Sequence, residues 1–283
     1  MKITGFRLGL LSAPLRLPFR TALREVSRVE DIVVELHAAD GTVGRGEAPP
    51  TAAITGETLG SIEAALRGHI CPALVGREAD GLEELLSAIS RSIVGNTSAK
   101  AAAEIAVWDL YAQQCGLPLW RLLGGGPNTL ETDLTISVND PETMARDTAD
   151  AVARGYGTLK IKVGENPALD LARLRAVRAA APEAVIRIDA NQAWTPRQAV
   201  GLLEQMQAGG LNIELVEQPV KGRDLDGLAF VTAHSPVPVM ADESVFSPQD
   251  AMTILQRHAA DYINIKLMKC GGLSNALRIA AAA

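Results

Sequence analysis

The sequence predicts an α/β protein in which a small α+β unit precedes a parallel (β/α)8-type barrel. From about residue 126 onward, short apolar strands alternate with helices, and repeated βα units are typical of a parallel sheet. Charged residues also recur at the carboxyl ends of successive predicted strands. This favours a barrel, because those ends meet on one face of a barrel. In an open sheet the same residues would be spread too widely to share a ligand.

Residues 1–125 predict the α+β unit. A β-hairpin is expected from Ile32–His37 and Val43–Glu47, which flank an Asp-Gly turn. Three helices are expected to follow, at Thr58–Arg67, Leu82–Ile93 and Ser98–Gln114. The third is apolar on most sides and ends at a Gly-Leu-Pro stop signal, so it predicts a buried helix.

Residues 126–283 predict the barrel unit, and a run of three glycines marks the boundary near residue 125. Six strands are expected there, at Asp133–Val138, Leu159–Val163, Val185–Asp189, Ile213–Glu217, Pro238–Asp242 and Tyr262–Lys266. Four of the helices between or after them should open with a cap residue and a proline, at Asp140-Pro141, Asn166-Pro167, Thr195-Pro196 and Ser247-Pro248. Because a closed barrel needs eight βα units, we expect an incomplete barrel in a chain truncated at its C-terminal end.

The composition excludes several classes of function. The chain has 283 residues, is 47% hydrophobic and carries a formal net charge of −6, which gives no reason to expect nucleic acid or an anionic membrane as a partner. No stretch approaches the ~20 apolar residues that span a bilayer. The three cysteines are odd in number and widely spaced, which predicts free thiols in a reducing, cytoplasmic compartment. The sequence leaves the oligomeric state open, a homo-oligomer included.

Five charged residues recur at the ends of successive predicted strands: Lys162, Asp189, Glu217, Asp242 and Lys266. They are separated by 27, 28, 25 and 24 residues, each gap being one βα unit. A single acidic residue in such a place is often only a capping or solvated residue, but five in succession predict a site. Three carboxylates make a hard oxygen site suited to Mg²⁺, and the absence of His and Cys argues against zinc.

The lysines of this set predict proton transfer. Lys162 and Lys266 come from well-separated strands, so they could flank a bound carbon, one removing a proton and the other returning it to the opposite face. Lys160 lies on the same strand face as Lys162, and its like charge is expected to disfavour the protonated form of its neighbour. A divalent ion would stabilise the negative charge left on the substrate.

Several motifs around these residues resemble the enolase superfamily, in its muconate-lactonizing-enzyme-like subgroup. They are the Lys160-Ile161-Lys162 strand, Asp189-Ala190-Asn191, Glu217-Gln218-Pro219, Ala241-Asp242-Glu243-Ser244, Asn264-Ile265-Lys266 and Lys269-Cys270-Gly271-Gly272. Within that subgroup, N-terminal segments resemble the L-Ala-D/L-Glu epimerases, which are dipeptide epimerases. These segments are Pro18–Arg24, Gly46–Glu57 and Gly95–Ala101.

The resemblance implies a Mg²⁺-dependent dipeptide epimerase that acts on a small-molecule dipeptide such as L-Ala-D-Glu in murein peptide recycling. It implies proton transfer by Lys162 and Lys266 through a metal-stabilised enolate, with Asp189, Glu217 and Asp242 as the metal ligands. Substrate-binding roles are implied for Arg24 (toward the glutamate side chain), Thr135 and Lys160. The N-terminal unit would cap the barrel mouth and help to choose the substrate.

Other readings of the resemblance stay open. The chain could be another enzyme of the subgroup: an N-acylamino acid racemase, an o-succinylbenzoate synthase or a muconate cycloisomerase. It could also be an inactive fragment that keeps the motifs but lacks a closed barrel. The Asp-x-Asp pair that binds the dipeptide ammonium in dipeptide epimerases likewise has no equivalent in these 283 residues. Two further acids lie near the predicted strand ends. Glu214 is expected to point away from the site, being of opposite parity to Glu217, and Glu243 is expected beside the site without belonging to the five.

Overall fold

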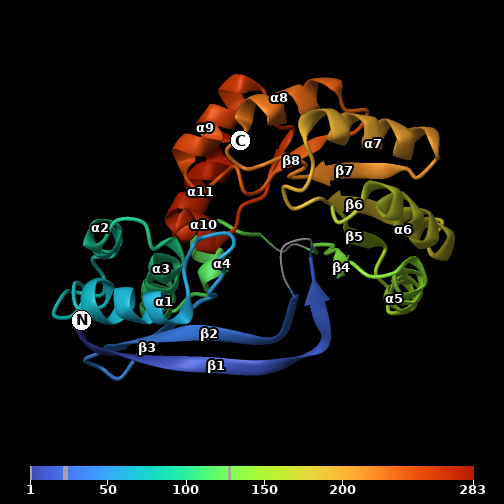
Figure 1. Cartoon of the computed structure of the whole chain (residues 1–283). Helices are drawn as coiled ribbons and strands as arrows, with labels where there is room; N and C mark the ends of the chain where they lie inside the picture. Colours follow the sequence, from blue (N-terminus) through green and yellow to red (C-terminus); the bar gives the residue numbers. More distant parts are fainter. Residues whose placement is uncertain (1, 22–24, 127–128) are drawn as a thin grey trace.

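The computed structural model describes residues 2–21, 25–126 and 129–283. It contains a three-stranded antiparallel sheet of order β1-β2-β3 and a six-stranded parallel sheet of order β4-β5-β6-β7-β8-β9. Figure 1 shows the two sheets with their helices as two neighbouring lobes. The predicted fold class is confirmed.

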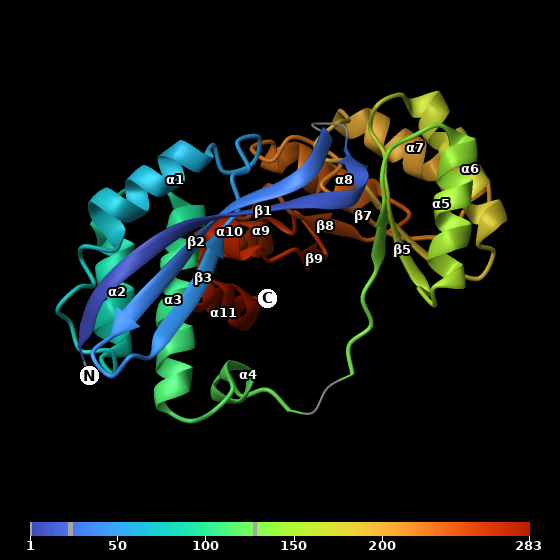
Figure 2. The same cartoon turned by 90° about the horizontal axis from the view of Figure 1, so that it is seen from below.

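The antiparallel sheet consists of β1 (Ile3–Arg20), β2 (Glu25–Ala38) and β3 (Val43–Ala48). The predicted hairpin is confirmed as β2 and β3, which pair from Ile32↔Ala48 to His37↔Val43. Strands β1 and β2 extend well beyond it as a long two-stranded arm, whose length the sequence did not predict. In the view from below, this arm runs from the helices of the first lobe toward the parallel strands (Figure 2).

The three predicted helices of the first lobe are confirmed. They are α1 (Leu59–Ala65), α2 (Leu82–Ser92) and α3 (Thr97–Gln114), and a π-helical turn η1 (Leu66–Ile70) and a short α4 (Leu119–Leu122) were not predicted. Helix α3 is buried along most of its length and packs on β3. The contact requires glycine, because a Cβ on Gly46 would lie 1.9 Å from the carbonyl oxygen of Ala102. This close approach fixes α3 against the sheet.

The parallel sheet consists of β4 (Leu134–Ile136), β5 (Thr158–Lys162), β6 (Val185–Asp189), β7 (Ile213–Glu217), β8 (Val239–Ala241) and β9 (Tyr262–Ile263). The last two strands are shorter than predicted, so Asp242 and Lys266 lie just beyond their strands. Register aligns the charged residues, because Lys162 is opposite Asp189 and Asp189 is opposite Glu217. The described part of the chain contains six βα units, as predicted.

Most helices of the second lobe lie along the outer face of this curved sheet (Figure 1), whereas the short helix after Lys266 packs on α3 of the first lobe. The helices of the second lobe are α5 (Pro141–Ala153), α6 (Pro167–Ala180), α7 (Pro196–Ala208), α8 (Leu225–His234), α9 (Pro248–Arg257), α10 (Leu267–Cys270) and α11 (Leu273–Ala282). All four predicted cap residues before proline accept hydrogen bonds from the first helical turn. No helix in the described ranges is long and apolar enough to cross a membrane.

Each lobe has its own hydrophobic core. One core holds buried residues from Ile3 to Leu110, and the other holds residues from Ile136 to Ile279. The arm joins the lobes at a second place, where the backbone N–H of Val138 donates to the carbonyl oxygen of Arg20 at 3.3 Å. The N-terminal lobe therefore reaches the carboxyl ends of the parallel strands. The boundary near residue 125 stays a prediction.

Candidate active site

The carboxyl ends of the parallel strands bring the predicted acids together. Asp189 and Glu217 are the last residues of β6 and β7, and Asp242 directly follows β8. All three are buried, with relative exposures of 0%, 3% and 0%. Carboxylates are rarely buried unless they are paired, so each needs a positively charged or hydrogen-bonding neighbour. The predicted lysines supply much of this pairing.

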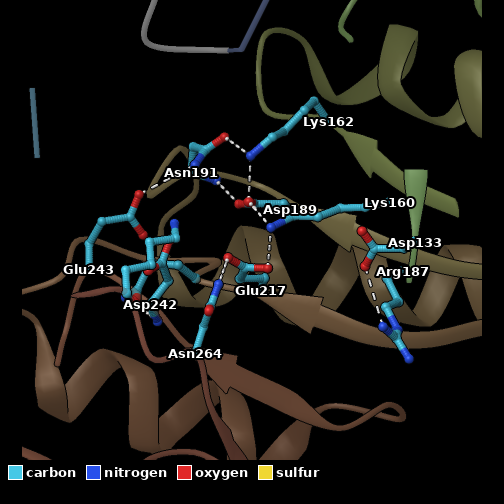
Figure 3. A network of polar contacts seen from close by, with 12 residues as sticks. Asp133, Lys160, Lys162, Arg187, Asp189, Asn191, Glu217, Asp242, Glu243 and Asn264 are labelled. Carbon is cyan, nitrogen blue, oxygen red and sulfur yellow. Dashed lines mark hydrogen bonds and ion pairs between the residues drawn. The ribbon is translucent and has the colours of Figure 1, made fainter. Parts of the chain in front are cut away.

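Lys160 and Lys162 both contact Asp189 from the neighbouring strand (Figure 3). Nζ of Lys162 donates to Oδ2 of Asp189 at 2.6 Å and to the amide oxygen of Asn191 at 3.0 Å. Nζ of Lys160 lies 3.0 Å from Oδ2 of Asp189 and 2.5 Å from Oε2 of Glu217. Two lysines on one strand face therefore reach two acids, and Lys160 bridges the pair.

A second group of lysines surrounds Asp242. Lys266 forms an ion pair with Oδ2 of Asp242, and Nζ of Lys269 lies 2.6 Å from Oδ1. Lys269 is fully buried and also donates to the backbone carbonyl oxygens of Asp242 and Asn264. Asn264 in turn donates from Nδ2 to Oε1 of Glu217 at 2.9 Å. The short segment after β9 thus holds two of the three acids.

The electrostatics of the acids differ from one to the next. Burial alone would raise the pKa of Asp242, but Lys269 and Lys266 outweigh it and bring the pKa down to about 2. Burial likewise opposes the lowered pKa of Asp189, which Lys162 and Lys160 produce. The pKa of Glu217 is raised, first by burial and then by the charge of Asp189.

Two lysine pKa values lie above their usual range. Burial would lower the pKa of Lys160, but Asp189 and Glu217 raise it. The same balance holds for Lys266, whose pKa is raised by Asp242 against the effect of burial. The sequence predicts Lys160 as a positive neighbour of Lys162 and, by resemblance, as a substrate-binding residue. The structure adds that Lys160 is itself paired with two carboxylates.

The donor set fits a hard divalent cation. Asp189, Glu217 and Asp242 supply carboxylate oxygens from three adjacent strand ends, which is the chemistry Mg²⁺ prefers. Oδ1 of Asp242 receives no well-directed hydrogen bond although it is buried. As they stand, the described residues hold no group of three or more His, Cys, Asp and Glu side chains close enough to ligate a metal. The lysine ammonium groups lie between the acids, so a cation held there would compete with them for oxygen atoms.

A cavity of about 230 Å³ lies beside the lysines that pair with the three acids, although the acids themselves are not among its lining residues. Lys162 and Lys266 both line it, although Lys162 comes from β5, the second strand of the sheet, and Lys266 follows β9, the last strand. The other lining residues come from the parallel sheet and from the N-terminal lobe: Phe19, Thr21, Thr51, Ala53, Ile54, Thr135, Lys160, Asn191, Glu243 and Met268. Of the expected substrate residues, Thr135 and Lys160 therefore face this cavity, while Arg24 lies outside the described residues.

Three further residues at the site were not assigned roles from the sequence. Asn191 accepts from Lys162 and donates from Nδ2 to Oε1 of Glu243 at 3.3 Å. Glu243 is buried, and burial followed by the charge of Asp242 raises its pKa to about 7. Lys269 is the third. Each of the three lies one to three residues from a residue with a predicted role, and this proximity in sequence is the signal that could have found them. A turn of the chain can bring such a neighbour back to the site.

Glu214 does not join the site, as predicted, but the regular strand alternation on which that prediction rests is interrupted beside it. A register shift follows the Ile186↔Ile213 pair, and the next pair is Arg187↔Leu215. Glu214 therefore has no register partner in β6, so alternation along the strand does not fix the direction of its side chain. It forms an ion pair with Arg187, whose guanidinium also lies 3.3 Å from Asp133. This pairing lies away from the acids, as Figure 3 shows for Arg187 and Asp133.

Comparison with known protein families identifies the class of protein to which this fold and site belong. Residues 9–124 match the mandelate racemase/muconate lactonizing enzyme N-terminal domain, and residues 143–283 match the enolase C-terminal domain-like family. The chain belongs to the muconate-lactonizing-enzyme-like part of the enolase superfamily.

The similar proteins and solved structures within this family include dipeptide epimerases. The chain is 52% identical to an L-Ala-D/L-Glu epimerase of Clostridium acetobutylicum over 100% of its own length and 79% of that protein. The substrate-liganded structure of the L-Ala-D/L-Glu epimerase from Bacillus subtilis is 49% identical, with a TM-score of 0.97, and the match covers 99% of this chain and 79% of that one. A dipeptide epimerase from Enterococcus faecalis, complexed with Mg and L-Leu-L-Tyr, is 40% identical, with a TM-score of 0.96 over 100% of this chain and 79% of that one.

Proposed function

We propose that this chain is a Mg²⁺-dependent dipeptide epimerase that acts on L-Ala-D/L-Glu. The observation that carries the proposal is the cavity lined by Lys162 and Lys266 beside three buried acids. Similar proteins named for this activity, and structures described with Mg and a dipeptide, support it. Epimerisation of a dipeptide inverts the configuration at one α-carbon, which requires a proton to leave one face and another to arrive at the opposite face.

Lys162 and Lys266 are the groups that would move these protons. Each presents an ammonium or amine nitrogen to the cavity from a different side of the sheet, so one takes the α-proton while the other donates from the far face. Asn191 and Asp189 hold Nζ of Lys162 by two directed hydrogen bonds, which fixes its position before the substrate arrives.

Asp189, Glu217 and Asp242 would hold the magnesium ion. When bound, Mg²⁺ supplies positive charge next to the substrate carboxylate, where negative charge develops as the α-proton leaves. Lys160 lies between Asp189 and Glu217 and also lines the cavity, so its positive charge would face the bound substrate as well.

Substrate choice would rest on the N-terminal lobe and β4. We assign Arg24 to the glutamate side-chain carboxylate, since a guanidinium suits bidentate pairing with a carboxylate. Thr135 lines the cavity beside Lys160, its partner in the strand register. The three free cysteines of the described residues and the absence of a membrane-spanning helix among them are consistent with a cytoplasmic location.

Incubation of the protein with L-Ala-D-Glu and Mg²⁺ in D₂O tests the function. We expect deuterium to enter the glutamate α-position and L-Ala-L-Glu to accumulate. A folded sample that shows neither deuterium uptake nor epimerisation would contradict the proposal. An Arg24→Ala variant, with Arg24→Lys beside it, tests the substrate. We expect Arg24→Ala to lose preference for glutamate over leucine at the second position, whereas unchanged preference would favour another enzyme of the subgroup.

A further inference from the structure

The loop between β3 and α1, residues 49–58, reaches from the N-terminal lobe to the active-site cavity. Ala53 and Ile54 line that cavity together with the two proton-transfer lysines. The same two residues also line a neighbouring cavity of about 600 Å³, whose wall includes Arg223 and Gln192. Glu243 borders both cavities as well. The loop therefore forms part of the wall that separates the active-site cavity from a larger space beside it.

Both ends of this loop are fastened to the first turn of α3. At one end, the hydroxyl of Ser98 donates to the carbonyl oxygen of Pro49 at 2.8 Å. At the other end, the carboxylate of Glu57 accepts the backbone N–H of Ser98 at 2.8 Å and that of Ala99 at 3.1 Å. Glu57 is only 5% exposed and Ser98 is fully buried, so water does not compete for these bonds.

Glu57 also replaces a cap that α3 lacks. The residue before the helix, Asn96, has a left-handed backbone and makes no capping hydrogen bond, because its amide donates to the carbonyl of Val94 instead. The N–H groups of the first turn of a helix have no partner within the helix, and a negative charge there is favoured by the helix dipole. Glu57 thus binds the loop to the helix with two charge-assisted hydrogen bonds.

The anchor itself is rigid. Helix α3 cannot shift toward β3, because the glycines at the contact already leave no room for a Cβ. Within the loop, the backbone N–H groups of Ile54 and Thr55 both donate to the carbonyl oxygen of Thr51 at 2.9 Å. The position of the loop wall is therefore set mainly by the three hydrogen bonds at its ends.

We propose that Glu57 is a positioning residue for substrate selectivity: it holds loop 49–58 on α3 so that Ala53 and Ile54 keep the active-site cavity separate from its neighbour. When the anchor is lost, the wall moves and the two spaces join, so the site accepts larger substrate side chains. Glu57 touches neither the lysines nor the acids, so the metal site keeps its partners. The proposal rests on the proposed function.

The test compares Glu57→Ala and Glu57→Gln with wild type, because the glutamine keeps one acceptor oxygen and should give an intermediate effect. Ser98→Ala removes the bond at the other end of the loop and should act in the same direction. Asp140→Ala is the matched control, since Asp140 caps α5 by accepting from the N–H of Thr143 at 2.9 Å and has no contact with the loop.

Two measurements are made on each protein. Hydrogen exchange reports the loop directly, and we expect amides 51–56 to exchange at least about tenfold faster in Glu57→Ala and unchanged in Asp140→Ala. The ratio of kcat/KM for L-Ala-L-Glu to that for L-Phe-L-Glu reports selectivity. We expect it to fall about tenfold in Glu57→Ala, which lies within the range that side-chain fit supplies.

The possible outcomes distinguish the role of Glu57 from general destabilisation and from failure of the proposed function. A folded Glu57→Ala protein with the wild-type exchange rate in the loop, or with a selectivity ratio within twofold of wild type, overturns the proposal. An equal change in Asp140→Ala would also overturn it, because the effect would then be general destabilisation. If the wild type epimerises neither dipeptide, the proposed function fails, while the exchange measurement still decides whether Glu57 anchors the loop.

Discussion

Replacement of Asp242 by asparagine should alter the pH dependence of stability in a way that the site geometry predicts. Lys269 and Lys266 outweigh the effect of burial and lower the pKa of the carboxyl from 3.8 to about 2. The difference corresponds to about 2 kcal/mol of stability at neutral pH. Because the folded-state pKa is depressed, this contribution is present above about pH 4 and is lost as the pH falls through the folded value near 2.

The assay is urea unfolding of wild type and Asp242→Asn in EDTA, at intervals from pH 6 to pH 2. The comparison isolates the Asp242 carboxyl, because the asparagine of the variant does not titrate. We therefore expect the difference in unfolding free energy between the two proteins to shrink by about 2 kcal/mol from pH 6 to pH 2. A difference that stays constant, or that grows toward acid pH, would refute the pairing of Asp242 with the two lysines.

Two further predictions concern the packing and the metal. Gly46→Ala should destabilise the protein by about 1–3 kcal/mol in urea unfolding, because the new methyl group would overlap the backbone of Ala102. Gly5→Ala is the control and should be near neutral, because a Cβ there meets nothing within 4 Å. Mg²⁺ at one hundred times its Kd should raise the unfolding free energy by about 2.7 kcal/mol, and EDTA should reverse the gain. Glu217→Gln should remove most of this gain in stability. An equal gain in the variant would exclude Glu217 as a ligand.

Much of the parallel sheet was predictable, because its signals are local. Apolar strands and Pro-N1 helices repeat with a fixed spacing, and the residue pairs Lys162↔Asp189 and Asp189↔Glu217 follow from that spacing. The last two strands were harder to delimit. Lys266 was placed at a strand end, whereas the strand stops at Ile263 and the lysine immediately precedes a short helix.

The features that the sequence did not predict depend on contacts between distant segments. The register shift at Glu214 arises from the pairing of two strands, which no pattern within one strand reveals. Lys269 looks like an ordinary helix lysine until the turn after Lys266 folds it back onto Asp242. Glu57 is 41 residues from the N–H group of Ser98 that it accepts, so only the folded chain shows what it does.

Lys162 and Lys266 should exchange protons with opposite faces of one α-carbon. Single variants Lys162→Ala and Lys266→Ala, each incubated with L-Ala-L-Glu and separately with L-Ala-D-Glu in D₂O, test this assignment. Both variants should fail to epimerise, and each should still exchange the α-proton of one stereoisomer only, the opposite one for the two variants. Epimerisation by either variant, or loss of exchange with the same stereoisomer in both, would contradict the assignment of one lysine to each face.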